Sequence, residues 1–225
     1  MIISEKVLDY AQVLLSHCRI SIAYLEMYEG LCKQHNQHHN AVKEAVLFFK
    51  IIEKALASEL MVETCKMFED NSDVISVFKL KHICEQNKQL FQGITRDAII
   101  NDELLPVPFS IDRLLKKVDE DLNKHKIVID NLKAQRDQIW AHNDKKYFLE
   151  PDILENKCPI QFEEIKELLH LASDFSNMII FAFTGSIVSP RFNPPGAYDK
   201  DIERIMKLME LGCQKEKENN GSPEI

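Results

Sequence analysis

The residues best suited to acid–base and phosphate chemistry lie in one short stretch, RDQIWAHND, residues 136–144. The guanidinium of Arg136 stays charged at any physiological pH, and its planar fork matches two phosphate oxygens at once. His142 can take up or release a proton near neutral pH, as a general acid or base must. The stretch therefore predicts chemistry on a phosphate group.

Arg136 falls on the apolar face of a long amphipathic helix that Ser110 caps. Apolar positions recur there at spacings of three and four. The series is Ile111, Leu115, Val118, Leu122, His125, Ile129, Leu132, Arg136 and Ile139. Because a buried arginine cannot lose its proton, we expect Arg136 to meet an anion or to lie at an open end of the bundle. In a continuous helix His142 lies about 120° around the axis from Arg136, so the two converge only if the helix loosens between them.

Positive charge is concentrated around these two residues. Residues 124–146 carry six basic and three acidic side chains, a sum of +3, whereas the whole chain carries −8. The acidic total argues against a protein that coats nucleic acid without specificity, because such binding depends on lysine and arginine. We expect a local phosphate site instead, to which Lys133, Lys145 and Lys146 contribute positive charge.

The remaining sequence predicts helices and no strand. We expect helices over about residues 4–32, 40–71, 72–91, 161–189 and 199–211. Residues 94–109 form a connector, because the prolines of PVPF interrupt a helix. The prediction is an all-α helical bundle with one domain over residues 1–214. Its motif-bearing core covers about 110–189, further helices precede and follow this core, and residues 215–225 form a polar, disordered tail.

Other features argue against export, membrane insertion and bound metal. The N-terminus lacks the pattern of a secretory signal, and the longest apolar stretch, 178–188, is shorter than the roughly 20 residues of a membrane helix. The six cysteines form no CxxC pair, so we expect free thiols in a reducing cytoplasm. We interpret the histidine cluster His35, His38 and His39 as a polar turn. No metal and no cofactor are expected.

The run RDQIWAHNDKK resembles the signature of HEPN domains (higher eukaryotes and prokaryotes nucleotide-binding), which is an arginine, a polar residue and then a histidine. It is most similar to the abortive-infection U-type branch of that family. The similarity covers the motif and the helix on each side, about residues 110–189. It implies a helical bundle of HEPN type, which agrees with the helical pattern of the chain.

The resemblance implies a metal-independent endoribonuclease in phage defence, a toxin–antitoxin pair or a stress response. The protein would act on RNA as a homodimer, with an antitoxin or another regulatory protein as a further partner. By this resemblance His142 acts as general base or acid, Arg136 holds the phosphate and Asp137 orients one of them. Asn143 and Asp144 are supporting candidates. Asp144 stands where one toxin branch has a tyrosine, so control by tyrosine modification is not expected.

Three other interpretations remain open. The chain could be a catalytically inactive helical module that binds RNA, a nucleotide or a protein partner. It could also be a purely structural dimer. Without the family pattern, Arg136 and His142 would be interpreted as part of a structural ion pair with Asp137 or Asp144 at a helix end.

Overall fold

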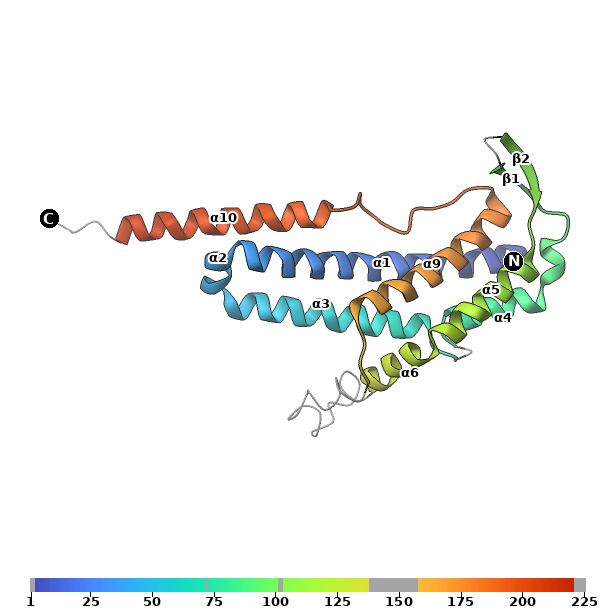
Figure 1. Cartoon of the computed structure of the whole chain (residues 1–225), viewed down its shortest axis with the longest axis horizontal. Coiled ribbons are helices and arrows are strands. Elements are labelled where there is room, and N and C mark those ends of the chain that lie inside the picture. Colours follow the sequence, from blue (N-terminus) through green and yellow to red (C-terminus); the bar gives the residue numbers. More distant parts are fainter. Residues whose placement is uncertain (1–2, 72, 101–102, 138–157, 221–225) are drawn as a thin grey trace. The chain divides into compact units, whose positions relative to one another are not determined.

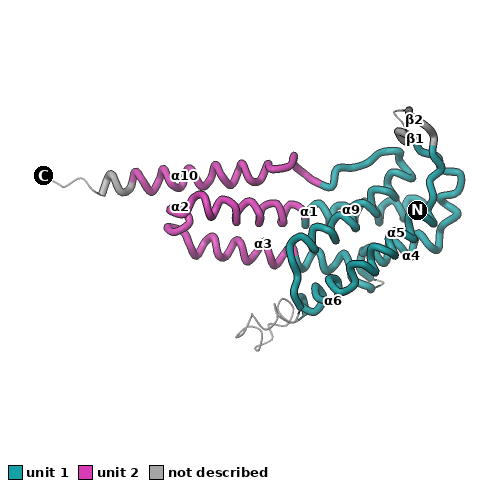
Figure 2. Tube along the Cα trace, in the orientation of Figure 1, with its two compact units in different colours: residues 1–21, 61–190 teal, residues 22–60, 191–225 magenta. Residues whose placement is uncertain are grey.

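The computed structural model describes residues 3–71, 73–100, 103–137 and 158–220, and most of them are α-helical (Figure 1). The predicted all-α class is therefore confirmed. The chain divides into two compact units (Figure 2): unit 1 comprises residues 1–21 and 61–190, and unit 2 comprises residues 22–60 and 191–225. The single domain expected over residues 1–214 stays a prediction.

Unit 2 is built from parts of four helices. These are α1 (Ile3–Gln37), α2 (His39–Glu44), α3 (Val46–Met67) and α10 (Ala197–Asn220); α1 and α3 also contribute to unit 1. Its core consists of Leu31, Ala41, Val42, Phe49, Leu56 and Met206. Helix α10 continues through residues 215–220, within the segment where we predicted a polar, disordered tail, and the division between domain and tail stays a prediction. The lysines and glutamates of that segment are strong helix formers.

Unit 1 contains the helices that position the motif. They are α4 (Val77–Gln86), α5 (Ile111–Lys124), α6 (Lys126–Gln135) and α9 (Phe162–Thr184), with a 3₁₀ turn at Lys88–Phe91. Helix α5 packs against α4, α6 and α9. The predicted apolar seam from Ile111 to Leu132 is buried. Burial of this seam fixes which side of α5 and α6 faces the core.

The helix predicted to run unbroken from Ser110 is interrupted at His125. Its backbone angles, φ −96° and ψ 10°, end α5 and begin α6. The buried His125 ring lies beside α9, with Nε2 3.4 Å from a carboxylate oxygen of Glu167. The periodic pattern missed this break because the buried series continues through it.

The connector over residues 94–109 contains two strands that the sequence did not predict. Strand β1 (Thr95–Ile100) pairs antiparallel with β2 (Glu103–Pro108), with Thr95 opposite Pro108. A proline has no N–H to give to a ladder, so it fits a strand that has a neighbour on one side only. The prediction of a chain without strands was therefore wrong.

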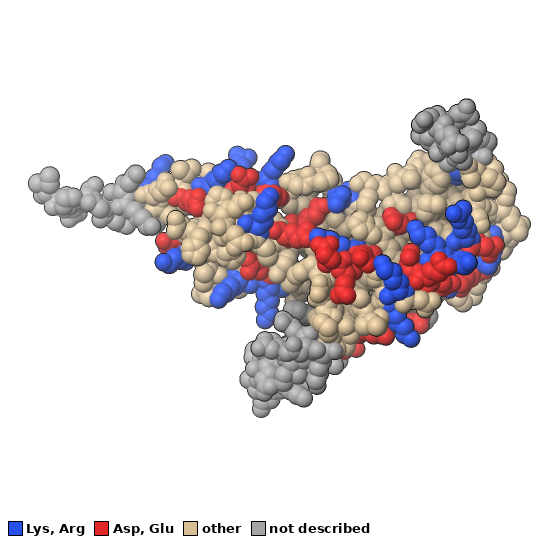
Figure 3. Space-filling model, viewed as in Figure 1, with Lys and Arg blue, Asp and Glu red and all other residues tan. Residues whose placement is uncertain are grey.

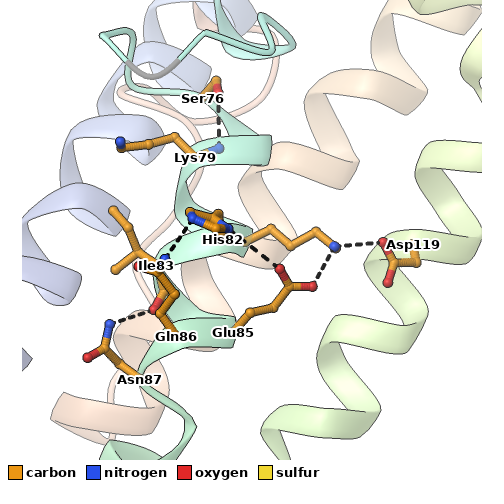
Figure 4. Close-up of polar contacts among 9 residues, drawn as sticks. Ser76, Lys79, His82, Ile83, Glu85, Gln86, Asn87 and Asp119 are labelled. Atoms are coloured by element: carbon orange, nitrogen blue, oxygen red, sulfur yellow. Dashed lines mark hydrogen bonds and ion pairs between the residues drawn. The ribbon is translucent and has the colours of Figure 1, made fainter.

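The ends of α4 and α9 follow local capping rules. Ser76 caps α4, since its hydroxyl accepts a hydrogen bond from the Lys79 N–H (Figure 4). Lys81 joins α4 to α5 through Asp119, with 3.0 Å between Nζ and Oδ1, and also bonds Glu85 at 2.6 Å. Gly185 ends α9 with a left-handed φ of 73°, a conformation that favours glycine. These contacts set the boundaries of the helices around the seam.

Candidate functional site

Arg136 directly follows α6, the second half of the buried seam. Its backbone is still helical, and its N–H bonds back to the carbonyls of Leu132 and Lys133. A cation at this end of a helix is favourable, because the last carbonyls carry partial negative charge. The side chain is 22% exposed, so the guanidinium reaches the surface only in part.

The guanidinium of Arg136 is held by two carboxylates. Nη1 forms an ion pair with Glu69, which follows the C-terminal end of α3. Nε and Nη2 both bind Oδ1 of Asp137, at 2.8 and 2.6 Å. The sequence led us to expect an anion for a semi-buried arginine, and the structure supplies two. The pairing with Asp137 is the contact that the ion-pair interpretation named.

These contacts raise the pKa of Arg136 above its ordinary value, so the side chain remains charged. Burial alone would lower the pKa of Arg136, but the hydrogen bonds to Glu69 and Asp137 outweigh that effect. Arg136 therefore stays positively charged and cannot serve as a general acid. What it can do chemically is hold an anion and stabilise negative charge.

Glu69 is a site residue that the sequence analysis missed. It lies 67 positions from Arg136 along the chain, in the segment between α3 and α4. No motif surrounds it, and only the packing of unit 1 brings the two together. The sequence indicated that the charge of Arg136 required an anionic partner, but it did not identify Glu69 as that partner.

Two basic residues near the motif are engaged by other groups of the protein. The Lys133 ammonium lies 5.7 Å from the centroid of the Phe78 ring, within the range of a cation–π contact. Lys124 bonds Glu167 at 3.1 Å. On the face shown in Figure 3, basic and acidic side chains are interspersed. Phosphate binding here would thus depend on a few residues.

Several predicted site residues lie outside the described part of the chain. These are His142, Asn143, Asp144, Lys145 and Lys146. Of the predicted catalytic set, the structure brings together Arg136 and Asp137. Whether His142 joins them stays a prediction.

Other groups in the described ranges offer weaker chemistry. His35 and His38 each approach a glutamate within unit 2, Glu53 at 2.6 Å and Glu210 at 3.0 Å. No three His, Cys, Asp or Glu side chains among the described residues are grouped to hold a metal ion. Burial raises the pKa of the Cys18 thiol to about 12, so it is protonated at neutral pH and a poor nucleophile.

Cys65 is a buried thiol on which the charges of the motif residues Arg136 and Asp137 act. Burial raises its pKa to about 11, although the charge of Arg136 acts in the opposite direction. The thiolate form is therefore scarce at neutral pH. Nucleophilic chemistry by this cysteine is disfavoured, which leaves Arg136 as the functional group of this region within the described residues.

The fold and the site define an all-α bundle with a semi-buried arginine at the end of a core helix. The sequence model of the HEPN AbiU2 family, described as AbiU2, matches residues 4–206. This match covers most of the chain, and the chain belongs to this family of abortive-infection-type HEPN domains. A search of curated proteins and a search of solved structures each found no match.

Among the helices of the described residues, none combines the length and the apolar character needed to cross a bilayer.

Proposed function

We propose that this protein is a metal-independent endoribonuclease of HEPN type with a role in abortive infection or a related stress response. The observation that carries this proposal is the family match over residues 4–206, which includes Arg136 and His142 at the spacing of the motif. The position of Arg136 supports it, since a guanidinium at a helix end suits a phosphate. RNA is the proposed substrate.

The proposed reaction is transfer of the phosphate to the neighbouring ribose. The 2′-oxygen attacks phosphorus and loses its proton to a base, while the bond from phosphorus to the 5′-oxygen breaks and that oxygen takes up a proton. The products are a 2′,3′-cyclic phosphate and a 5′-hydroxyl. His142 serves as base or acid, and Arg136 stabilises the charge that builds up on the phosphate oxygens.

The ion pair with Glu69 adds a condition to this mechanism. Nη1 of Arg136 is occupied by Glu69, while Asp137 occupies Nε and one N–H of Nη2. A phosphate that takes the Nη1 and Nη2 edge competes with the Glu69 carboxylate for Nη1, and the two groups have charge of the same sign. Glu69 is thus proposed as a competitor for the ligand, whereas Asp137, bound mainly on the Nε side, orients the guanidinium.

The proposed assembly is a homodimer in which two copies of the motif line one cleft. Such an arrangement would supply one base and one acid for the two proton transfers. An antitoxin or another regulatory protein is a further proposed partner. Lys133, Lys145 and Lys146 are proposed to contact RNA phosphates.

The alternative is a catalytically inactive module that binds RNA, a nucleotide or a protein. One observation favours it: the charge of Arg136 is already compensated by Glu69 and Asp137, as in a purely structural ion pair. The two functions differ in one measurable product, the cyclic phosphate.

RNA cleavage in the presence of EDTA tests the proposal. Purified protein is incubated with mixed RNA, and fragments ending in a 2′,3′-cyclic phosphate are quantified. We expect His142→Ala and Arg136→Lys to abolish cleavage; the lysine variant keeps the charge for Glu69 but loses the planar fork. The exposed His170 and Arg204 provide matched controls, and alanine at either should leave cleavage unchanged.

Two outcomes would count against the proposal. Cleavage that persists in both motif variants would remove these residues from the active site. RNA binding without cleavage by the wild-type protein would favour the inactive module. Thermal denaturation of each variant shows whether a loss of cleavage reflects a loss of fold.

A further inference from the structure

A hollow in unit 1 uses none of the residues of the RDQIWAHND motif. It lies where the β-hairpin, the start of α5 and the last turns of α9 meet, and its volume is about 380 Å³. Its walls are formed by Arg96, Asp97, Val107, Pro108, Phe109, Ser110, Arg113, Leu114, Lys117, Met178 and Phe181. This volume is within the range of about 300–1,000 Å³ that is common for small-molecule sites.

Six of the wall residues are apolar, and they come from all three elements. Val107 and Pro108 belong to β2, Leu114 to α5, and Met178 and Phe181 to α9, while Phe109 follows the hairpin. Met178 is 37% exposed, so part of this apolar residue is open to solvent. An apolar ligand body would cover this surface and be stabilised by its removal from water.

Two cations stand beside this apolar surface. Arg113 and Lys117 are four residues apart on α5, so they share one face of the helix, and both are exposed. Two neighbouring charged residues of α5 are paired outside the hollow: Asp112 bonds Lys88 at 2.6 Å and Lys116 lies 3.8 Å from Glu120. The first turn of α5, which Ser110 caps, adds partial positive charge from the helix dipole.

The third cation of the hollow has a structural task. The Arg96 guanidinium donates to the carbonyls of Phe181 and Ala182 and so covers the C-terminal end of α9. Asp97 is the one acidic side chain of the lining. The lining therefore carries a net charge of +2 in a chain of net charge −8, and that excess comes from Arg113 and Lys117.

We propose that this hollow binds a small amphipathic organic anion. The apolar body of the ligand lies against Phe109, Met178 and Phe181, and its carboxylate, sulfonate or phosphate group lies between Arg113 and Lys117. The charge complementarity selects an anion over a neutral ligand, and the apolar walls select an organic anion over an inorganic one. The site is separate from the proposed nuclease function and does not depend on it.

Two fluorescent probes with the same apolar body test the proposal. One is 1-anilinonaphthalene-8-sulfonate, and the other is N-phenyl-1-naphthylamine, which lacks the sulfonate. Fluorescence titration of the full chain should give tighter binding of the sulfonate by about tenfold or more. Inorganic sulfate should not displace it. Equal affinity for the two probes, or displacement by inorganic sulfate at comparable concentration, would overturn the proposal.

A second measurement locates the bound probe. The chain has seven methionines, and a ¹³C-methyl spectrum can follow each of them after Met178→Leu has identified the Met178 signal. The signal of Met178 should shift with the same saturation curve as the fluorescence. Saturation without a shift of Met178 would place the probe elsewhere and overturn the assignment.

Charge variants complete the test. The double variant Arg113→Gln with Lys117→Gln should weaken sulfonate binding by about tenfold and leave the neutral probe unchanged. Lys116→Gln with Lys124→Gln removes the same charge from the same helix outside the hollow, and should bind like the wild type. Equal losses in both double variants would show that net charge alone is responsible, which contradicts a built site.

Discussion

Replacing Glu69 with glutamine isolates the carboxylate that occupies Arg136. The substitution keeps the size of the side chain but removes its charge, so Arg136 loses the ion pair with Glu69 and keeps its contacts with Asp137. If Glu69 competes with phosphate for Nη1, Glu69→Gln should bind RNA more tightly than the parent protein. The opposite result is expected if Glu69 only positions the arginine.

The magnitude follows from the burial of the pair. The Arg136 and Glu69 side chains are 22% and 24% exposed, so the pair lies between an exposed and a buried one. Exposed pairs contribute up to about 1 kcal/mol, and breaking a buried pair costs about 3–5 kcal/mol. A value of about 1–2 kcal/mol for displacing Glu69 corresponds to about 5- to 30-fold tighter binding of RNA.

Binding is measured without cleavage by placing Glu69→Gln in a His142→Ala background. Fluorescence polarisation of a labelled RNA at fixed salt gives the Kd of the double variant and of His142→Ala alone. Glu63→Gln serves as the control. Glu63 lies in the last turns of α3 and, like Glu69, is paired with basic partners, His17 at 3.2 Å and Lys66 at 2.6 Å. It removes the same negative charge and should leave the Kd nearly unchanged.

Unchanged or weaker RNA binding by Glu69→Gln would refute the reasoning. An equal gain in Glu69→Gln and Glu63→Gln would also refute it, because the effect would then come from net charge. If His142→Ala alone does not bind RNA, the result contradicts the proposed function. It does not bear on the role of Glu69.

Three further predictions concern the fold. Ser76→Ala should lower the free energy of unfolding by about 1 kcal/mol, because the Lys79 N–H loses its cap; urea denaturation measures this loss. Leu132→Ala should cost about 2–5 kcal/mol in the same assay, because this fully buried side chain leaves a cavity. Hydrogen bonds from Lys33 and Gln34 lower the pKa of Asp199, so its contribution to stability is present above the unfolded pKa of about 3.9 and is lost as pH falls through the folded pKa. The difference in Tm between wild type and Asp199→Asn should therefore shrink as pH is lowered from 7 toward 3; a constant difference would contradict this assignment.

The sequence by itself determined the all-α class of the fold and the buried face of its central helices. Apolar residues at spacings of three and four fixed the buried face of α5 and α6, because only one face of a helix can turn toward the core. The type and spacing of Arg136 and His142 were enough to indicate the family, since those features are local along the chain. The requirement that Arg136 meet an anion also followed from the sequence, because its charge cannot be removed by burial.

The tertiary structure decided which groups meet. The Glu69 carboxylate reaches Arg136 across 67 positions of sequence, and no local pattern encodes that contact. The break at His125 lies beside Glu167 of α9, a neighbour from a distant segment. The pairing of β1 with β2 is local, but the prolines of β2 concealed it. The hollow beside α5 exists only because the hairpin, α5 and α9 converge. Local spacing governs the helices, whereas contacts between distant segments depend on how the helices pack, and this is why only the folded chain showed them.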